Sequence, residues 1–194
     1  MSTLTIKILF SIFWLATGFI RSPFARRNKS NTITTDNKTG VEKMTLFGTM
    51  LGLMLLPLVY LLTPLLAFAD YELPSFAPFI GVALMPFTLW LFYRSHYDLG
   101  RNWSVSLEIR EGHHIVDTGV YRHIRHPMYT AIWLWCIIQA LMLHNYLAGL
   151  GGLVGFGLLY VLRVDEEEAM MLREFGPAYE SYKRRTKRLI PFLF

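Results

Sequence analysis

The sequence predicts an all-α integral membrane protein with about five transmembrane helices. Of its 194 residues 53% are hydrophobic, and the mean hydropathy is +0.35, which is more apolar than an ordinary soluble domain. Three stretches without Asp, Glu, Lys or Arg are each long enough to cross a bilayer, which takes about 20 residues. The basic residues fall almost entirely into three connections that would share one side of the membrane.

The first apolar segment, residues 4–20, contains one charged residue, Lys7, and is expected to span the membrane. A cleaved signal peptide is the alternative, but no convincing small-residue cleavage site follows the segment. Residues 21–43 are rich in Ser, Thr, Asn and basic side chains, which predicts a flexible linker without a chemical role.

The second and third spans are expected at residues 44–68 and 74–93, both of which are free of charged side chains. Pro57, Pro64 and Pro86 lie within them. Because proline has no backbone N–H to donate, we expect these helices to be kinked.

The last uncharged run, residues 128–162, is too long for one crossing. As a single helix it would measure about 52 Å, against a hydrocarbon core of about 30 Å. It is therefore expected to fold back as a helical hairpin with spans at 128–143 and 147–163. Gly151 and Gly155 have the spacing that allows close helix contact, which we expect inside this hairpin.

The distribution of basic residues predicts the orientation. All of the 19 Lys and Arg except Lys7 lie in residues 21–43, in residues 94–127 or in the stretch from Arg163 onward. Since cytoplasmic connections are enriched in Lys and Arg, we expect a multi-pass protein with a cytoplasmic loop at 94–127 and a cytoplasmic tail at 164–194. The net charge of +5 is attributed to this topology and to membrane lipids, with no nucleic acid as a partner.

The two polar segments are expected to be structured. Polar and apolar residues alternate over 104–110, and a turn at Glu111 and Gly112 would lead into 113–116, which predicts a small interfacial hairpin or an extended lid. The tail is expected to be helical over 164–175 and to restart as a helix at 178–187.

Two polar clusters flank the final hairpin and form the candidate site. One is the basic and aromatic stretch 119–129, and the other contains Arg163 and Glu167, which are four residues apart on one helix face. Ionisable groups this close to hydrocarbon are usually functional. A guanidinium can hold a carboxylate in two hydrogen bonds, and aromatic rings suit a cationic cofactor. Glu166 and Glu168 point to other faces and are expected to be solvated.

Two other interpretations of the basic stretch stay open. His113, His114, His123 and His126 could form a metal site, but no acidic partner follows in a suitable pattern and the proline after His126 disfavours a helical conformation there. The single cysteine, Cys136, lies inside the fourth span, so a Cys-based metal site is excluded and no metal is predicted. The basic side chains could also only anchor the helix at the lipid headgroups.

The C-terminal half resembles the isoprenylcysteine carboxyl methyltransferase family, in a short prokaryote-like form. The residues that carry the resemblance are Gly119, Tyr121, Arg125, His126, Pro127, Tyr129, Arg163, Glu167, Phe175, Gly176, Tyr179, Tyr182 and Pro191. The resemblance implies that S-adenosylmethionine is used to methylate the carboxylate of a prenylated cysteine, within a multi-helix membrane fold. The lack of a Gly-rich strand-to-helix fingerprint agrees with a fold unlike the Rossmann-type methyltransferases.

The resemblance also implies roles for individual residues. Arg163 would bind the acceptor carboxylate and act in catalysis together with Glu167. The cofactor site would be lined by His113, His114, Ile115, Val116, Tyr121, His126, Pro127, Met128, Tyr129 and Glu167. The cofactor would enter from the cytoplasmic side, and a lipidated or lipid-like acceptor would enter from the bilayer.

Two alternative functions remain. The Arg-His-Pro signature is shared with phospholipid N-methyltransferases and some membrane sterol reductases, so the acceptor could be a phospholipid, a small thiol or an amine. A non-catalytic scaffold that binds anionic lipid through Arg122, Arg125 and the basic residues at 183–188 is the other possibility.

Overall fold

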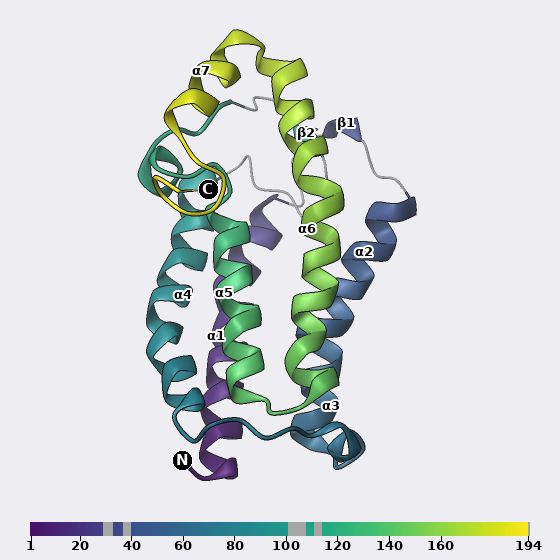
Figure 1. Ribbon diagram of the computed structural model, residues 1–194. Coiled ribbons are helices and arrows are strands. Elements are labelled where there is room, and N and C mark those ends of the chain that lie inside the picture. The colour runs from purple at the N-terminus through teal and green to yellow at the C-terminus, as the bar shows by residue number, and fades with distance from the viewer. Residues whose placement is uncertain (29–32, 37–39, 101–107, 111–113, 194) are drawn as a thin grey trace.

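The computed structural model describes residues 1–28, 33–36, 40–100, 108–110 and 114–193. The described chain is mostly helical, and its long helices run roughly along one axis (Figure 1). The elements are α1 (Thr3–Asn28), β1 (Ile33–Asp36), α2 (Gly40–Met50), the π-helical segment η1 (Leu51–Leu55), α3 (Leu56–Leu62), η2 (Ala67–Ala69), α4 (Ala77–Leu99), β2 (Glu108–Arg110), η4 (Gly119–Arg122), α5 (Pro127–Met142), α6 (Tyr146–Phe175) and α7 (Pro177–Arg185).

The helices form two packed groups. α1, α4 and α5 pack together, and α6 packs against both α5 and the α2–η1–α3 segment (Figure 1). By length and composition, α1, the continuous segment Gly40–Leu62, α4 and α6 can cross a membrane, while α5 is shorter at 16 residues. The all-α membrane architecture is therefore confirmed, and five crossings stay a prediction.

Aromatic side chains join the first of these groups. Phe13 of α1 and Phe92 of α4 both meet Trp135 of α5 edge to face, with ring centroids 5.9 and 6.1 Å apart. All three rings are buried. Such pairs contribute about 0.5–1.5 kcal/mol beyond their burial, so they fix the position of α5, which carries half of the site at its start.

Several helix ends differ from the predicted spans. The second span ends at Leu62 rather than 68, because the chain turns extended at Thr63 (φ −139°) just before Pro64. α4 continues through the charged residues to Leu99, six residues past the expected end, and stops at Gly100 with φ 57°. The helix thus carries Asp98 into the region expected to be loop, where its carboxylate accepts a hydrogen bond from the Val120 N–H at 2.9 Å.

The short strand β2 has a different partner from the one expected. It pairs antiparallel with β1, which lies in the connection between α1 and α2, and not with the described residues 114–116 of the expected partner. The neighbouring residues 101–107 and 111–113 lie outside the described residues. The expectation that residues 21–43 form only a flexible linker is wrong for the described part, since it contains the end of α1, a strand and the first turn of α2.

Glycines bring α6 into backbone contact with the second span. A Cβ on Gly155 would lie 2.4 Å from the carbonyl oxygen of Gly48, and a Cβ on Gly52 would lie 2.2 Å from that of Gly151. The Thr49 hydroxyl donates a hydrogen bond to the Gly155 carbonyl at 3.1 Å. We call this contact the glycine seam. The expectation that Gly151 and Gly155 serve the hairpin is wrong, because their closest neighbours belong to α2, η1 and the first residue of α3.

The two ends of the bundle differ in character. β1, β2, η4, α7 and the C-terminus gather at one end, which we call the polar end (Figure 1). At the opposite end, the buried Asn145 accepts hydrogen bonds from the N–H groups of Leu147 and Ala148, and its amide donates to Asp70 at 2.8 Å. The predicted topology places the 21–43 connection, the 94–127 loop and the tail on the same side of the membrane, and their described parts do lie at one end of the bundle. The cytoplasmic location of this end stays a prediction.

Replacing Gly155 by alanine should destabilise the protein, because the new methyl group would overlap the backbone of α2. We expect a loss of about 1–3 kcal/mol in the free energy of unfolding, as for other overpacked contacts, seen as a lower thermal midpoint in detergent. Gly48→Ala is the matched control across the same contact, since a Cβ there meets no atom within 4 Å and alanine favours the helix. Equal losses in the two variants would contradict this geometry of the seam.

Candidate active site

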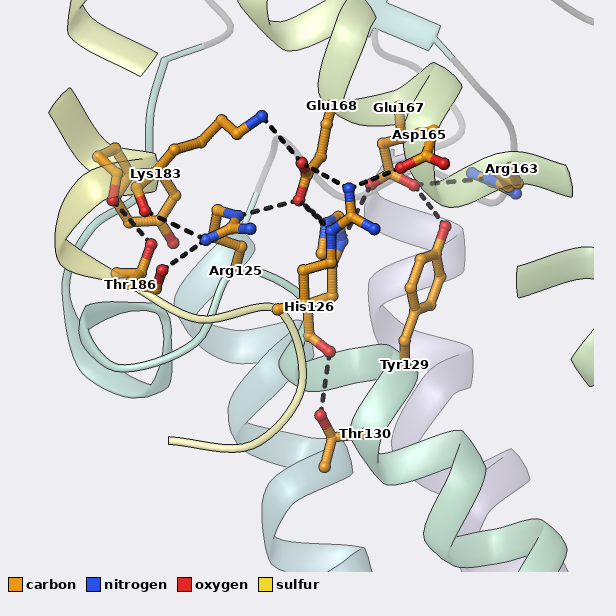
Figure 2. A network of polar contacts seen from close by, with 12 residues as sticks. Arg125, His126, Tyr129, Thr130, Arg163, Asp165, Glu167, Glu168, Lys183 and Thr186 are labelled. Atoms are coloured by element: carbon orange, nitrogen blue, oxygen red, sulfur yellow. Dashed lines mark hydrogen bonds and ion pairs between the residues drawn. The ribbon is translucent and has the colours of Figure 1, made fainter. Parts of the chain in front are cut away.

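The site forms where α6 leaves its apolar part. α6 has 30 residues and would measure about 45 Å, so it exceeds the roughly 30 Å of hydrocarbon, and its charged residues begin at Arg163. Arg163 and Glu167 are one turn apart on the same face. Glu168 is rotated from Glu167 by about 100°, so the two adjacent carboxylates meet different partners (Figure 2).

Arg163 lies between two carboxylates from different helices. Its Nη1 is 3.4 Å from Oε1 of Glu42 on α2, and its Nε is 3.6 Å from Oε2 of Glu167. Arg163 is 9% exposed and Glu42 is 5% exposed. A guanidinium and a carboxylate buried this deeply near hydrocarbon are costly unless they are paired, so the contacts between α2 and α6 hold both in place.

Glu167 is tied to the start of α5. The Tyr129 hydroxyl donates a short hydrogen bond to Oε2 of Glu167, and Oε1 lies 3.9 Å from Nδ1 of His126 (Figure 2). The rings of His126 and Tyr129 are stacked, with centroids 5.1 Å apart and planes 6° apart. The side chain of Glu167 remains 28% exposed, and a carboxylate can accept about four hydrogen bonds, so it retains capacity for a ligand.

The proline that begins α5 explains how His126 reaches this position. Pro127 occupies the first helical turn, where its missing N–H is tolerated. His126 precedes the helix with φ −122° and ψ 57°, which confirms that it is not helical. Its ring is therefore placed between Glu167 and Glu168 rather than along the helix face.

Glu168 is the centre of a second network, which we call the Glu168 hub. It is 3% exposed, so the expectation that it is solvated is wrong. Its carboxylate accepts hydrogen bonds from Arg125 at 3.0 Å and from Arg188 at 3.1 Å, and lies 3.3 Å from Nε2 of His126 and 3.1 Å from Nζ of Lys183. Glu168 is buried because the tail folds back and brings Lys183 and Arg188 to α6. Figure 2 shows Lys183 beside Glu168.

The tail is held along the start of α5 by backbone contacts as well. The N–H of Arg125 donates to the Lys187 carbonyl at 2.7 Å, and the N–H of His126 donates to the Arg188 carbonyl at 3.0 Å. The hydrogen bond to Glu168 raises the pKa of Arg188 above its ordinary value, so this cation stays charged at any physiological pH. The expectation of a structured tail with a break at Gly176 is confirmed, since α7 begins at the next residue.

Two tyrosines connect this tail to α4. The Tyr182 hydroxyl donates to the Tyr121 carbonyl at 2.8 Å, and the Tyr121 hydroxyl donates to the Ser95 carbonyl at 3.2 Å. Burial raises the pKa of both phenols, so both remain neutral donors. Tyr121 thus links η4 to α4, and its role in cofactor binding stays a prediction.

The structure brings some of the predicted site residues together. Arg163, Glu167, His126 and Tyr129 form one cluster, and Pro127 and Met128 begin the helix beneath it. His114, Ile115 and Val116 lie before η4 in a stretch without regular secondary structure, and their role in cofactor binding stays a prediction. His113 lies outside the described residues. In the part of the chain that the structure describes, no three His, Cys, Asp or Glu side chains gather in a way that could hold a metal ion.

Sequence reasoning missed Glu42 and Glu168. The sequence did contain a signal for Glu42, since this acidic residue lies two positions before a long uncharged run, as Arg163 lies directly after another. Glu168 had none, because its partners become visible only when the tail is seen to fold back onto α6.

Comparison of the sequence with known proteins shows similarity to one family of membrane methyltransferases. Residues 79–173 match the isoprenylcysteine carboxyl methyltransferase (ICMT) family. The chain is 30% identical over 115 residues to the human protein-S-isoprenylcysteine O-methyltransferase, which covers 58% of this chain and 40% of the human protein. It is 24% identical over 134 residues to a probable rice protein-S-isoprenylcysteine O-methyltransferase, which covers 68% of this chain and 70% of the rice protein.

A solved structure shares the fold. The eukaryotic intramembrane Ras methyltransferase ICMT superposes with a TM-score of 0.53 at 22% sequence identity, over 78% of this chain and 51% of that one. The expected resemblance to this family and the multi-helix membrane fold are thus confirmed. Glu42 lies outside the part that matches the family.

Glu168→Gln should loosen the tail, because Arg125, Lys183 and Arg188 lose a shared carboxylate. We expect a loss of about 3 kcal/mol in the free energy of unfolding, the lower end for a buried ion pair, since Lys183 and Arg188 are partly exposed. Thermal unfolding measures the loss of stability. Faster tryptic cleavage within residues 183–188 would show that the tail is the part that has loosened.

The control for this variant is Glu166→Gln, which removes the same charge from an exposed position on the same helix. It should change neither the thermal midpoint nor the cleavage rate. A Glu168→Gln protein as stable and as resistant as this control would show that the hub does not hold the tail.

Proposed function

Because residues 79–173 match the isoprenylcysteine carboxyl methyltransferase family, we propose that this protein methylates the carboxylate of a prenylated cysteine or a similar lipidic acceptor, with S-adenosylmethionine as the donor. The observation that carries the proposal is the pairing of Arg163 with Glu167 at the end of the apolar part of α6. One of these groups suits an anionic acceptor, and the other suits a cationic cofactor.

The donor groups present fit S-adenosylmethionine. The partly exposed carboxylate of Glu167 can accept hydrogen bonds from an ammonium group, and the aromatic rings of His126 and Tyr129, which attract cations, lie next to it. When bound, this cofactor supplies an electrophilic methyl group, whose bonding electrons stay on sulfur while a carboxylate oxygen forms the new bond. The polar end would receive it from the cytoplasm.

Arg163 would orient the acceptor. Its position supports entry from the bilayer, because Leu158, Val161 and Leu162, within the turn and a half before it, are all exposed on the outside of α6. A carboxylate is ionised at pH 7 and requires no general base. The protein therefore has to align the two reactants and to remove water from the nucleophile.

Methyl transfer from labelled S-adenosylmethionine tests the proposal. The purified protein in vesicles is offered a farnesylated cysteine or a lipid amine, and the product is treated with base. We expect a base-labile methyl ester on the farnesylated cysteine. Label on the lipid amine alone would overturn the acceptor class, and no transfer to either would overturn the methyltransferase function.

Glu167→Gln should weaken cofactor binding, because it keeps the shape of the side chain and removes the charge. A ligand present at about 100 times its dissociation constant stabilises a protein by roughly 2.7 kcal/mol, so wild type should show a clear thermal shift with S-adenosylhomocysteine. The variant should show most of that shift only at much higher ligand concentration. An unchanged dissociation constant would exclude Glu167 from the cofactor site.

Arg163→Lys should impair the acceptor rather than the cofactor. Lysine keeps the positive charge but loses the planar fork that grips a carboxylate at two points. Loss of a charge-assisted hydrogen bond, about 1.5–3 kcal/mol, lowers kcat/KM for the acceptor by about ten- to a hundredfold. The dissociation constant of S-adenosylhomocysteine should stay nearly constant, and a variant that loses cofactor affinity instead would assign Arg163 to the cofactor.

A further inference from the structure

The glycine seam sets the register that places Glu42 opposite Arg163. α2 and α6 run in opposite directions and meet where Thr49 contacts Gly155 (Figure 1). Glu42 lies seven residues before Thr49, and Arg163 lies eight residues after Gly155. Each separation is about two helical turns, roughly 10.5 Å along α2 and 12 Å along α6. The two side chains therefore lie at about the same level along the helix axes.

In this register, the guanidinium of Arg163 contacts two carboxylates at once. Glu42 approaches Nη1 at 3.4 Å and Glu167 approaches Nε at 3.6 Å, so each carboxylate occupies one edge of the planar group. An acceptor carboxylate that pairs with Arg163 must share the guanidinium with both. Glu42 also places a negative charge beside the position that the anionic acceptor would take, which opposes its binding.

Weaker binding of this kind favours the chemistry of the proposed reaction. The acceptor carboxylate loses its negative charge as the ester forms, so a cation stabilises the reactant more than the transition state. An unopposed arginine would therefore lower both KM and kcat, because binding that is stronger in the ground state does not accelerate the reaction.

We propose that Glu42 is a positioning residue that weakens the hold of Arg163 on the acceptor carboxylate and so keeps that carboxylate nucleophilic. This inference rests on the proposed function. It assigns a role to the second span, which lies outside the part of the chain that matches the family.

Glu42→Gln tests this role, because it keeps the size of the side chain and removes its charge. Removing the like charge should lower KM for the farnesylated cysteine on the order of tenfold and lower kcat by roughly threefold or more. The equilibrium dissociation constant of the same acceptor, measured with S-adenosylhomocysteine present, should fall in parallel with KM. The dissociation constant of S-adenosylhomocysteine itself should not change.

The matched control is Glu180→Gln, which removes a carboxylate from an exposed position on α7 and should leave KM and kcat unchanged. If Glu42→Gln does not fold, Glu42→Asp replaces it, since a shorter side chain draws the charge away from Arg163 and should shift KM and kcat in the same directions by less. A purely structural role would lower the thermal midpoint without lowering KM.

The outcomes separate the two proposals. Wild-type protein that methylates no acceptor would overturn the proposed function and this inference with it. Active wild type, together with a Glu42 variant whose acceptor KM is unchanged or raised, would overturn this inference alone.

Discussion

The polar end of this protein depends on one constraint, which is that the charged side chains at the end of an apolar helix must be paired when they are buried. Arg163, Glu167 and Glu168 all follow directly on the uncharged part of α6. Each is paired with a different part of the chain. Glu42 arrives from α2, His126 and Tyr129 from the start of α5, and Lys183 and Arg188 from the tail. The pairing of a few charges thus assembles segments that are far apart in the sequence.

The helical step of about 100° per residue gives two adjacent carboxylates different roles. Glu168 is fully engaged by cations, so it has a structural role and holds the tail against His126. Glu167 is shared by Tyr129 and Arg163 but stays partly exposed, so it keeps capacity for a ligand. Because His126 contacts both carboxylates, the geometry on the ligand side depends on the integrity of the hub.

The features that could be predicted from the sequence depend on residues that are close together in the chain. Apolar length predicted the helices, the i, i+4 spacing predicted that Arg163 and Glu167 share one helix face, and Pro127 predicted that His126 is not helical. The features that were missed depend on contacts between distant residues. Burial of Glu168 requires cations 15 and 20 residues later, the contact of Glu42 with Arg163 spans 121 positions, and the glycine seam requires Gly48 and Gly52 on another helix.

Equilibrium binding of S-adenosylhomocysteine to the purified wild-type protein tests most directly whether the polar end is a methyltransferase site. Saturable binding of one molecule per chain is expected, with a thermal midpoint that rises with ligand concentration as mass action requires of a ligand specific for the folded state. A folded protein that shows neither saturable binding nor a thermal shift would contradict the assignment of this site to methyl transfer.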